Sequence, residues 1–412
     1  MIIPSKQLSC SSITIAAKMG EQCKRGWWTK YSENKLVEIE SSILSAIKTT
    51  YKTWFVPIGS VVGNDDKIWT ISLNEESKNT PLVMLHGFAA GIGFWIKNFD
   101  DIAHDRPVYA IDLLGFGRSS RPVFGKDCET AERQWVDTLE EWRKQVKLDK
   151  FILLGHSFGG YLATSYAISH PDRVRHLILA DPWGFAEKPS DYKPSTRFRV
   201  LRVLLYPLYC FNPLSSIRGA GPWGPALVKK MRSDIAMRYK DTLKDTNIIT
   251  DYIYQCNSQY PSGETAFNSF VKDLTFSKNP MADRYDTIHE CTPITVVYGK
   301  ESWIDQSPAF VLQEQREDIN YVKVAVIPDA GHHIYSDQPD LFNEFVRETC
   351  RIADNSQDKK GMAPSAKLLK AQFDYDRIKA FVNVHKVHKK LTEEEIEEVV
   401  DKNTEEREVT PS

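Results

Sequence analysis

The chain has 412 residues, with 53 Lys and Arg against 55 Asp and Glu and a net charge of −2. This balance excludes a whole-surface attraction to nucleic acid, and we expect no nucleic-acid partner. An apolar content of 42% predicts a globular chain rather than a disordered one. The seven Cys residues are scattered without a Cys-x-x-Cys pair, which favours free thiols. We therefore expect no metal and no cofactor.

Residues 1–50 form an N-terminal segment in which Trp27 and Trp28 precede an amphipathic stretch. Apolar residues recur there at the spacing of a helix: Leu36, Ile39, Ile43 and Ile47. Trp at the start of such a segment is typical of an interfacial anchor, so Trp27 and Trp28 are predicted membrane contacts. The alternative is a helix packed on the protein core with Trp as its lid, and the pattern favours neither.

The next part of the chain is predicted to be rich in strands. Residues 53–73 indicate two strands joined by a turn. Short, almost continuously apolar runs follow, as expected of strands covered on both faces: PLVMLHG, PVYAIDL, FILLG, HLILAD, PITVVYG and VKVAVIP. Helical stretches separate several of them, which predicts an α/β fold with a mostly parallel sheet and helices on both faces. We assign residues 51–184 and 287–353 to this core.

Two regions depart from the alternation of strand and helix. Residues 185–286 are predicted to be a cap inserted into the core, with the Arg-containing apolar stretch RFRVLRVLLYPLYCF in it. Such a stretch is a second candidate for an exposed apolar surface. Residues 354–412 are a charged tail that ends in an acidic run, and we expect part of it to be disordered.

The strongest chemical signal is Gly155-His156-Ser157-Phe158-Gly159. A buried strand precedes this Gly-x-Ser-x-Gly and a helix follows it, which is the context of the nucleophile elbow in α/β-hydrolases. Glycine is expected at 155 and 159 because a side chain there would clash with the neighbouring strand or helix. The motif therefore predicts an α/β-hydrolase fold with Ser157 as its nucleophile.

A serine hydroxyl needs a base and an acid, which follow it in the chain order Ser, acid, His in this fold. His332 is our predicted base because it directly follows a small-residue turn after an apolar strand, and His333 is its competitor. Asp305 is the predicted acid because it lies in the loop after the preceding core strand. Glu301 in the same loop is the runner-up.

Two backbone amides are expected to form the oxyanion hole. One follows the nucleophile, at Phe158, and the other lies in the loop after the third core strand, at Phe88. His332 and Asp337 also match the form of an acyltransferase motif, His-x4-Asp. Asp337 can alternatively be the cap of the following helix.

The chain resembles a lipid-metabolising subfamily of α/β-hydrolases between Trp27 and Arg351. That subfamily contains the lyso-N-acylphosphatidylethanolamine lipase and the lipid-droplet coactivator of adipose triglyceride lipase. The motifs that carry the resemblance are GHSFGG, VMLHGFAAGIGFW, AIDLLGFGRSSRP, LADPWGF and AGHHIYSDQPDLFNEFV.

The resemblance implies a triad of Ser157, Asp305 and His332, membrane binding by Trp27 and Trp28, and lysophosphatidic acid acyltransferase activity at His332 and Asp337. The coactivator branch has Asn in place of the elbow Ser and Arg four positions before the acid. Here those positions are Ser157 and Glu301, whereas Gly331 matches the coactivator.

These features lead to three hypotheses of function. The leading one is a serine lipase or phospholipase that hydrolyses acyl esters of phospholipids, N-acylphosphatidylethanolamine and its lyso form included. The alternatives are a coactivator of a triglyceride lipase and a lysophosphatidic acid acyltransferase. The expected partners are a phospholipid substrate, a membrane or lipid-droplet surface, and a triglyceride lipase or droplet-coat protein. We expect a cytoplasmic protein, peripheral on lipid droplets or the endoplasmic reticulum, with mitochondria as a further location.

Overall fold

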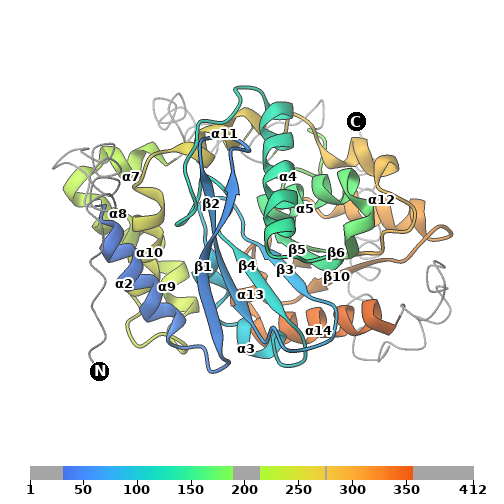
Figure 1. Cartoon of the computed structure of the whole chain (residues 1–412), viewed down its shortest axis with the longest axis horizontal. Helices are drawn as coiled ribbons and strands as arrows, with labels where there is room; N and C mark the ends of the chain where they lie inside the picture. The colour runs from blue at the N-terminus through green and yellow to red at the C-terminus, as the bar shows by residue number, and fades with distance from the viewer. Residues whose placement is uncertain (1–30, 189–213, 274–275, 356–412) are drawn as a thin grey trace, which may run out of the picture.

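A sheet of eight strands runs through the centre of the molecule (Figure 1). The structure is a computed structural model that describes residues 31–188, 214–273 and 276–355. In sheet order the strands are β1 (Tyr51–Gly59), β2 (Asp66–Leu73), β4 (Val108–Ile111), β3 (Leu82–Leu85), β5 (Phe151–His156), β6 (Val174–Ala180), β9 (Ile294–Gly299) and β10 (Val322–Ile327). Both pairings of β2 are antiparallel and the other pairings are parallel. The predicted mostly parallel sheet is confirmed.

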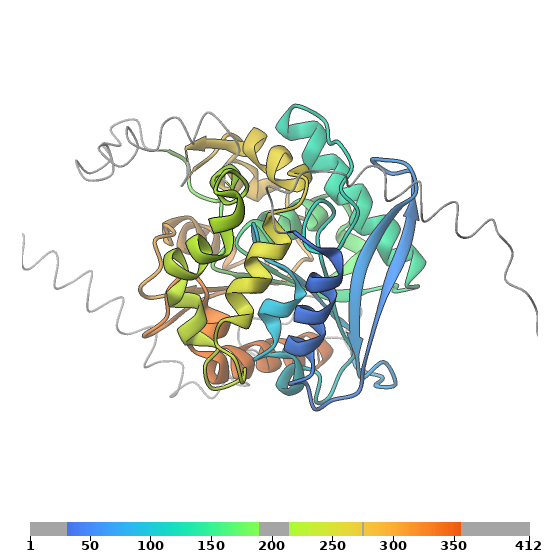
Figure 2. The same cartoon turned by 90° about the vertical axis from the view of Figure 1, so that its left-hand side faces the viewer.

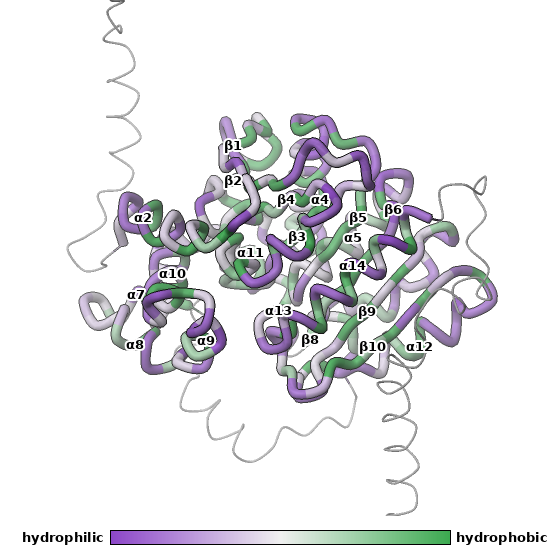
Figure 3. The backbone as a smooth tube through the Cα atoms, turned by 90° about the horizontal axis from the view of Figure 1, so that it is seen from below, coloured by the Kyte–Doolittle hydropathy of each residue, from purple (hydrophilic) through white to green (hydrophobic). Residues whose placement is uncertain are grey.

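Helices cover both faces of this sheet, as the continuous apolar runs predict. Successive strand residues point to opposite faces, so Leu153 joins one apolar cluster while Ile152 and Leu154 join the other. On the first face lie α4 (Cys128–Gln145), α5 (Phe158–Ser169) and α12 (Ser307–Arg316); α3 (Phe99–Ile102) and α14 (Pro339–Asn355) lie on the second (Figure 1). In Figure 3 the hydrophobic colour is concentrated in the central strands.

Helix α4 illustrates how the sequence specifies one of these elements. Its N-cap Asp127 accepts a hydrogen bond from the Thr130 amide at 2.7 Å, which satisfies one of the free N–H groups of the first turn. Trp135 and Trp142, seven residues apart, then face the sheet and are buried. The Trp142 indole N–H donates to Thr70 of β2 at 3.0 Å, which fixes the helix against the sheet.

The chain between β6 and β9 leaves the sheet and returns to it, as the predicted insertion requires. Its described elements are α7 (Ser215–Gly219), α8 (Gly224–Met231), α9 (Ser233–Arg238), α10 (Ile248–Asn257), α11 (Ser262–Phe270), β7 (Val271–Asp273) and β8 (Phe276–Ser277). Helices α7 to α10 gather at one end of the molecule, which faces the viewer in Figure 2. We call α7 to α11 the cap. The predicted boundaries of the cap, core and tail stay predictions, and the stretch RFRVLRVLLYPLYCF lies outside the described residues.

The N-terminal helix α2 (Glu33–Leu44) packs against α10 of the cap. Leu36 and Ile43 are buried in an apolar cluster, and Ile39 and Ile47 pack against that cluster. The core-packed alternative therefore holds for this helix. Trp27 and Trp28 lie outside the described residues, and the contact predicted for them stays a prediction. Within residues 31–188, 214–273 and 276–355, no helix has the length and apolar character needed to cross a membrane.

Candidate active site

Ser157 lies at the sharp turn between β5 and α5. Its backbone has φ 53° and ψ −121°, a strained conformation for a residue with a side chain. A Cβ at Gly155 would come within 2.3 Å of the Gly159 carbonyl oxygen, and one at Gly159 within 2.5 Å of the His86 carbonyl oxygen. The predicted need for glycine at both positions is confirmed, and the turn holds the Ser157 hydroxyl at the carboxyl end of the sheet.

His332 lies in the loop after β10, and its side chain reaches Ser157 at the carboxyl end of the sheet. Its Nε2 lies 3.0 Å from Ser157 Oγ, at hydrogen-bonding distance. His333 does not make this contact: its Nδ1 lies 3.0 Å from the Tyr335 hydroxyl. The elbow itself supports the histidine loop, because His156 Nε2–H donates to the His332 carbonyl oxygen at 2.9 Å. Of the two candidates, the structure thus brings His332 to the serine.

The carboxylate beside His332 belongs to Asp181, the residue that follows β6. Asp181 Oδ2 lies 2.5 Å from His332 Nδ1, and the Asp181 side chain is fully buried. The Gly299 amide donates to Oδ1 at 3.2 Å and the Ser302 hydroxyl donates to Oδ2 at 2.5 Å. The contacts of His332 with Asp181 on one side and with Ser157 on the other form a continuous hydrogen-bonded chain, which we call the Ser157–His332–Asp181 chain.

The expectation that Asp305 supplies the acid is corrected by this geometry. Asp305 is exposed, and its Oδ1 accepts hydrogen bonds from the Ser307 amide at 3.0 Å and the Ser307 hydroxyl at 2.8 Å. It therefore supports the start of α12. The loop after β9 does reach the site, but through Ser302; Glu301, the runner-up, is also exposed. Asp181 was missed although it directly ends a predicted strand and keeps the order Ser, acid, His.

Burial sets the electrostatics of the site. It lowers the pKa of His332, and the nearby guanidinium groups of Arg232 and Arg238 lower it further, so the imidazole rests in its neutral form. Burial also raises the pKa of Asp181, while the hydrogen bond from Ser302 favours its carboxylate. A neutral imidazole whose Nδ1–H points at a carboxylate presents a free Nε2 lone pair to the serine hydroxyl.

Of the two predicted oxyanion donors, Phe158 directly follows Ser157 in the chain, and Phe88 lies in a loop that contacts Ser157 in space. Phe158 is the first residue of α5, so its N–H has no carbonyl of the same helix to bind. Phe88 follows Gly87, where a Cβ would come within 2.9 Å of Ser157 Cβ. The loop that carries Phe88 therefore lies directly against Ser157. Both phenyl rings pack on Phe267 of α11, with ring centroids 4.3 Å and 4.8 Å away.

Asp337 has a structural role beside the histidine loop. It is the last residue of α13 (Ile334–Asp337), and its carboxylate accepts the Gly331 amide at 2.9 Å and pairs with Arg238 Nε of α9 at 2.5 Å. The expectation that Asp337 caps the next helix is thus replaced by a bond within the loop that precedes His332 and an ion pair to the cap.

The outer side of His332 is flanked by Trp303 and by the cap. The Trp303 ring centroid lies 5.0 Å from that of His332, although 52% of Trp303 is exposed. Arg232 of the cap lies 3.5 Å from His333 Nε2. An aromatic side chain and a guanidinium therefore stand at the solvent side of the histidines.

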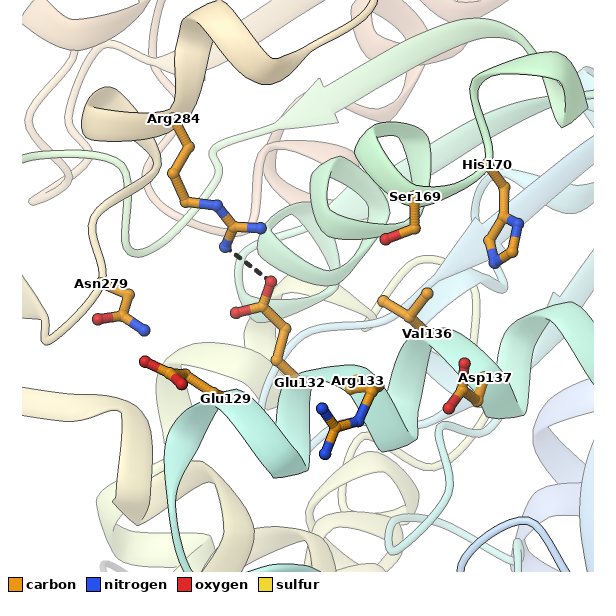
Figure 4. Close-up of a pocket in the computed structure, with 9 residues that line it drawn as sticks. All are labelled: Glu129, Glu132, Arg133, Val136, Asp137, Ser169, His170, Asn279 and Arg284. Carbon is orange, nitrogen blue, oxygen red and sulfur yellow. Dashed lines mark hydrogen bonds and ion pairs between the residues drawn. The ribbon is translucent and has the colours of Figure 1, made fainter.

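A cavity of about 590 Å³ lies away from this chemistry (Figure 4). It is lined by Glu129, Glu132, Arg133, Val136, Asp137, Ser169, His170, Asn279 and Arg284. Glu132 and Arg284 form an ion pair at 2.7 Å across it. Because no residue of the Ser157–His332–Asp181 chain lines this cavity, we do not assign the reaction to it.

Comparisons with known proteins agree with this architecture. A family model described as the alpha/beta hydrolase fold matches residues 80–339. The chain is 45% identical over 325 residues to the 1-acylglycerol-3-phosphate O-acyltransferase ABHD5 of Mus musculus, covering 78% of this chain and 91% of that protein. It is 42% identical over 346 residues to the (Lyso)-N-acylphosphatidylethanolamine lipase of Homo sapiens, covering 81% of this chain and 98% of that protein.

Solved structures show the same fold at low identity. The naproxen esterase of Bacillus subtilis has a TM-score of 0.51 at 17% identity, covering 78% of this chain and 99% of that one. A membrane phospholipase A has a TM-score of 0.52 at 17% identity, covering 83% and 97%. Sheet, elbow and relatives agree: the chain belongs to the α/β-hydrolase family, in the subfamily of the (lyso)-N-acylphosphatidylethanolamine lipase and ABHD5.

Proposed function

We propose that this protein is a serine lipase that hydrolyses acyl esters of phospholipids, with N-acylphosphatidylethanolamine and its lyso form as substrates. The observation that carries the proposal is the Ser157–His332–Asp181 chain, in which Ser157 Oγ and His332 Nε2 are 3.0 Å apart. The relative whose name states this lipase activity, 42% identical to the chain, supports the choice of substrate. The protein acts on substrate from a membrane or droplet surface, with Trp27 and Trp28 as contacts.

The first half of the reaction transfers the acyl group to the enzyme. His332 Nε2 takes the proton of Ser157 as Oγ forms a bond to the ester carbonyl carbon. The carbonyl oxygen becomes an oxyanion that the amides of Phe88 and Phe158 stabilise. Asp181 stabilises the imidazolium of His332. The carbon–oxygen bond to the glycerol then breaks, and its oxygen leaves with the proton from His332.

The second half returns the enzyme to its starting state. Water loses a proton to His332 Nε2 while its oxygen attacks the carbonyl carbon of the acyl-enzyme. The bond to Ser157 Oγ breaks, Oγ recovers the proton from His332, and the fatty acid leaves. Because acid and base are one histidine, each proton taken is given back within the cycle.

Acyl transfer is the second candidate, because the chain is 45% identical to a relative named as a 1-acylglycerol-3-phosphate acyltransferase. In that reaction an alcohol of lysophosphatidic acid takes the place of water in the second half, after Ser157 has been acylated by acyl-CoA. A role as coactivator of a triglyceride lipase would not require Ser157 to meet His332. The 3.0 Å contact of these side chains therefore favours hydrolysis.

The test measures fatty acid released from lyso-N-acylphosphatidylethanolamine in vesicles by the full chain. We expect Ser157→Ala to lose hydrolysis, whereas Ser60→Ala, at an exposed position after β1, retains it. Equal hydrolysis by Ser157→Ala and wild type would refute the proposal. A parallel reaction with acyl-CoA and lysophosphatidic acid detects transfer, and stimulation of a triglyceride lipase by both wild type and Ser157→Ala would support the coactivator instead.

A further inference from the structure

The loop after β3, residues 87–94, is held in an unfavourable conformation. We call it the oxyanion loop because it carries Phe88 and lies against Ser157 at Gly87. Ala89, the residue after Phe88, has φ 60°, in the left-handed region that a residue with a Cβ rarely adopts. Such a conformation costs energy and persists only where surrounding contacts hold it. The position of the Phe88 amide thus depends on the contacts that hold this loop in place.

Two side chains of the cap helix α10 form hydrogen bonds with the oxyanion loop. Asn257 Nδ2 donates to the Ala89 carbonyl oxygen at 2.8 Å, and the Gly93 amide donates to the Tyr252 hydroxyl oxygen at 3.3 Å. Tyr252 is fully buried. A Cβ at Gly91 would come within 2.5 Å of its hydroxyl oxygen. Helix α10 therefore contacts the loop at two places: at Ala89, through Asn257, and at Gly91 and Gly93, through Tyr252.

Glu40 of the N-terminal helix α2 fixes Tyr252 in turn. The Tyr252 hydroxyl donates to Glu40 Oε2 at 3.2 Å, while Glu40 Oε1 accepts from Trp69 Nε1 and from Arg118, each at 2.8 Å. Glu40 is 1% exposed. Burial raises its pKa, and the Arg118 guanidinium opposes that shift by favouring the carboxylate. With both oxygens bonded, the carboxylate is a fixed acceptor for the tyrosine.

Asp112, after β4, holds the oxyanion loop from the side of the sheet. Its Oδ1 accepts the Ile92 amide at 2.8 Å and its Oδ2 accepts the Arg118 amide at 2.7 Å. The bond from the Ile92 amide anchors the end of the loop that is further from Phe88. The end nearer Phe88, where Ala89 is strained, is bonded to Asn257 of the cap.

We propose that Tyr252 and Asn257 are positioning residues for the acyl-transfer step, with Glu40 acting through Tyr252. They hold the oxyanion loop so that the Phe88 amide meets the charge that develops on the carbonyl oxygen. This inference rests on the proposed function for its reaction. It gives the N-terminal helix and the cap a role in the chemistry itself, in addition to any contact with lipid.

The test compares rates at which an alkyl fluorophosphonate labels Ser157 in the full chain. The phosphoryl oxygen of this probe occupies the position of the oxyanion, so labelling reports the donors without assuming a lipid substrate. Because losing a whole donor costs about 10²–10³-fold, we expect a displaced donor to cost about 10-fold in Tyr252→Phe and in Asn257→Ala. Tyr254→Phe is the matched control: Tyr254 lies on the same helix, with its ring against Gly224.

A second readout separates positioning from folding and from binding. For hydrolysis of the lysophospholipid, kcat should fall by the same factor as labelling while KM stays within about twofold, since the donors act in the transition state. In Glu40→Gln the one carbonyl oxygen is needed by Trp69 and Arg118, so the amide NH₂ would face the Tyr252 hydroxyl in place of its acceptor, and kcat should fall in the same direction as in Tyr252→Phe.

Labelling by Tyr252→Phe and Asn257→Ala within about twofold of wild type would overturn the inference, as would a loss matched by Tyr254→Phe or confined to KM. If the wild type is labelled but cuts no lysophospholipid, the proposed substrate is wrong, and the labelling rates still decide the positioning role. An unlabelled wild-type Ser157 would overturn both.

Discussion

Replacing Asp181 by Asn should abolish most activity, although the side chains are nearly the same size. Asp181 Oδ2 accepts from His332 Nδ1 at 2.5 Å and from the Ser302 hydroxyl. An amide NH₂ placed there would donate to His332 and favour the tautomer with its proton on Nε2, which cannot accept the proton of Ser157. The same replacement in a serine protease triad lowers kcat about 10⁴-fold. We expect a similar loss, about 5.5 kcal/mol in the barrier.

The assay is kcat for a short-chain p-nitrophenyl ester, with the melting temperature measured on the same samples. Asp305→Asn is the matched control, because Asp305 is exposed and bonds only to Ser307 in the hydrogen bonds described above. We expect kcat of that variant within about twofold of wild type, since Asp305 is exposed and its described hydrogen bonds go to Ser307 rather than to His332. A larger loss in Asp305→Asn than in Asp181→Asn would refute the assignment of the acid.

Three further substitutions test the surroundings of the site. Arg232→Gln removes a positive charge that lowers the pKa of His332, so that pKa should rise and the acid limb of the profile of kcat/KM against pH should move to higher pH; an unmoved limb contradicts the coupling. Gly87→Ala places a Cβ 2.9 Å from Ser157 Cβ and should lower kcat on the order of 10²-fold with the fold intact by circular dichroism. Gly155→Ala would place a Cβ 2.3 Å from the backbone of α5; the melting temperature should drop sharply, and an unchanged value would contradict the packing.

Local patterns in the sequence predicted the sheet and selected Ser157 and His332, whose side chains the structure brings together. The elbow around Ser157 combines a buried strand, two obligatory glycines and a helix, and all of these signals lie within one short stretch of chain. His332 follows a strand end and a glycine turn, so its place at the sheet edge also follows from local sequence. The helical spacing of Leu36 and Ile43 predicted α2 but not its partner, because an apolar face fits a protein core and a lipid surface equally well.

Which carboxylate lies beside His332 depends on the order of the strands in the sheet, and local sequence does not specify that order. Strands β6 and β9 are neighbours, so the loops after both end at the same edge beside the histidine. Asp181 immediately follows β6, and its amide donates to the Val297 carbonyl of β9 at 2.7 Å, which turns its carboxylate into the site. Asp305 lies further along its own loop, where it meets Ser307 instead. The contacts of Glu40, Tyr252 and Asn257 likewise join residues far apart in the chain, so local sequence patterns could not predict them.

The most direct test of the account is the site at which an alkyl fluorophosphonate reacts with the protein. After labelling and proteolysis, mass spectrometry should locate the adduct on Ser157, because His332 Nε2 is placed to take its proton at 3.0 Å. His332→Ala should lower the labelling rate at least 10³-fold, since the base is then missing. An adduct on another residue, or equal labelling of Ser157 in His332→Ala, would contradict the account.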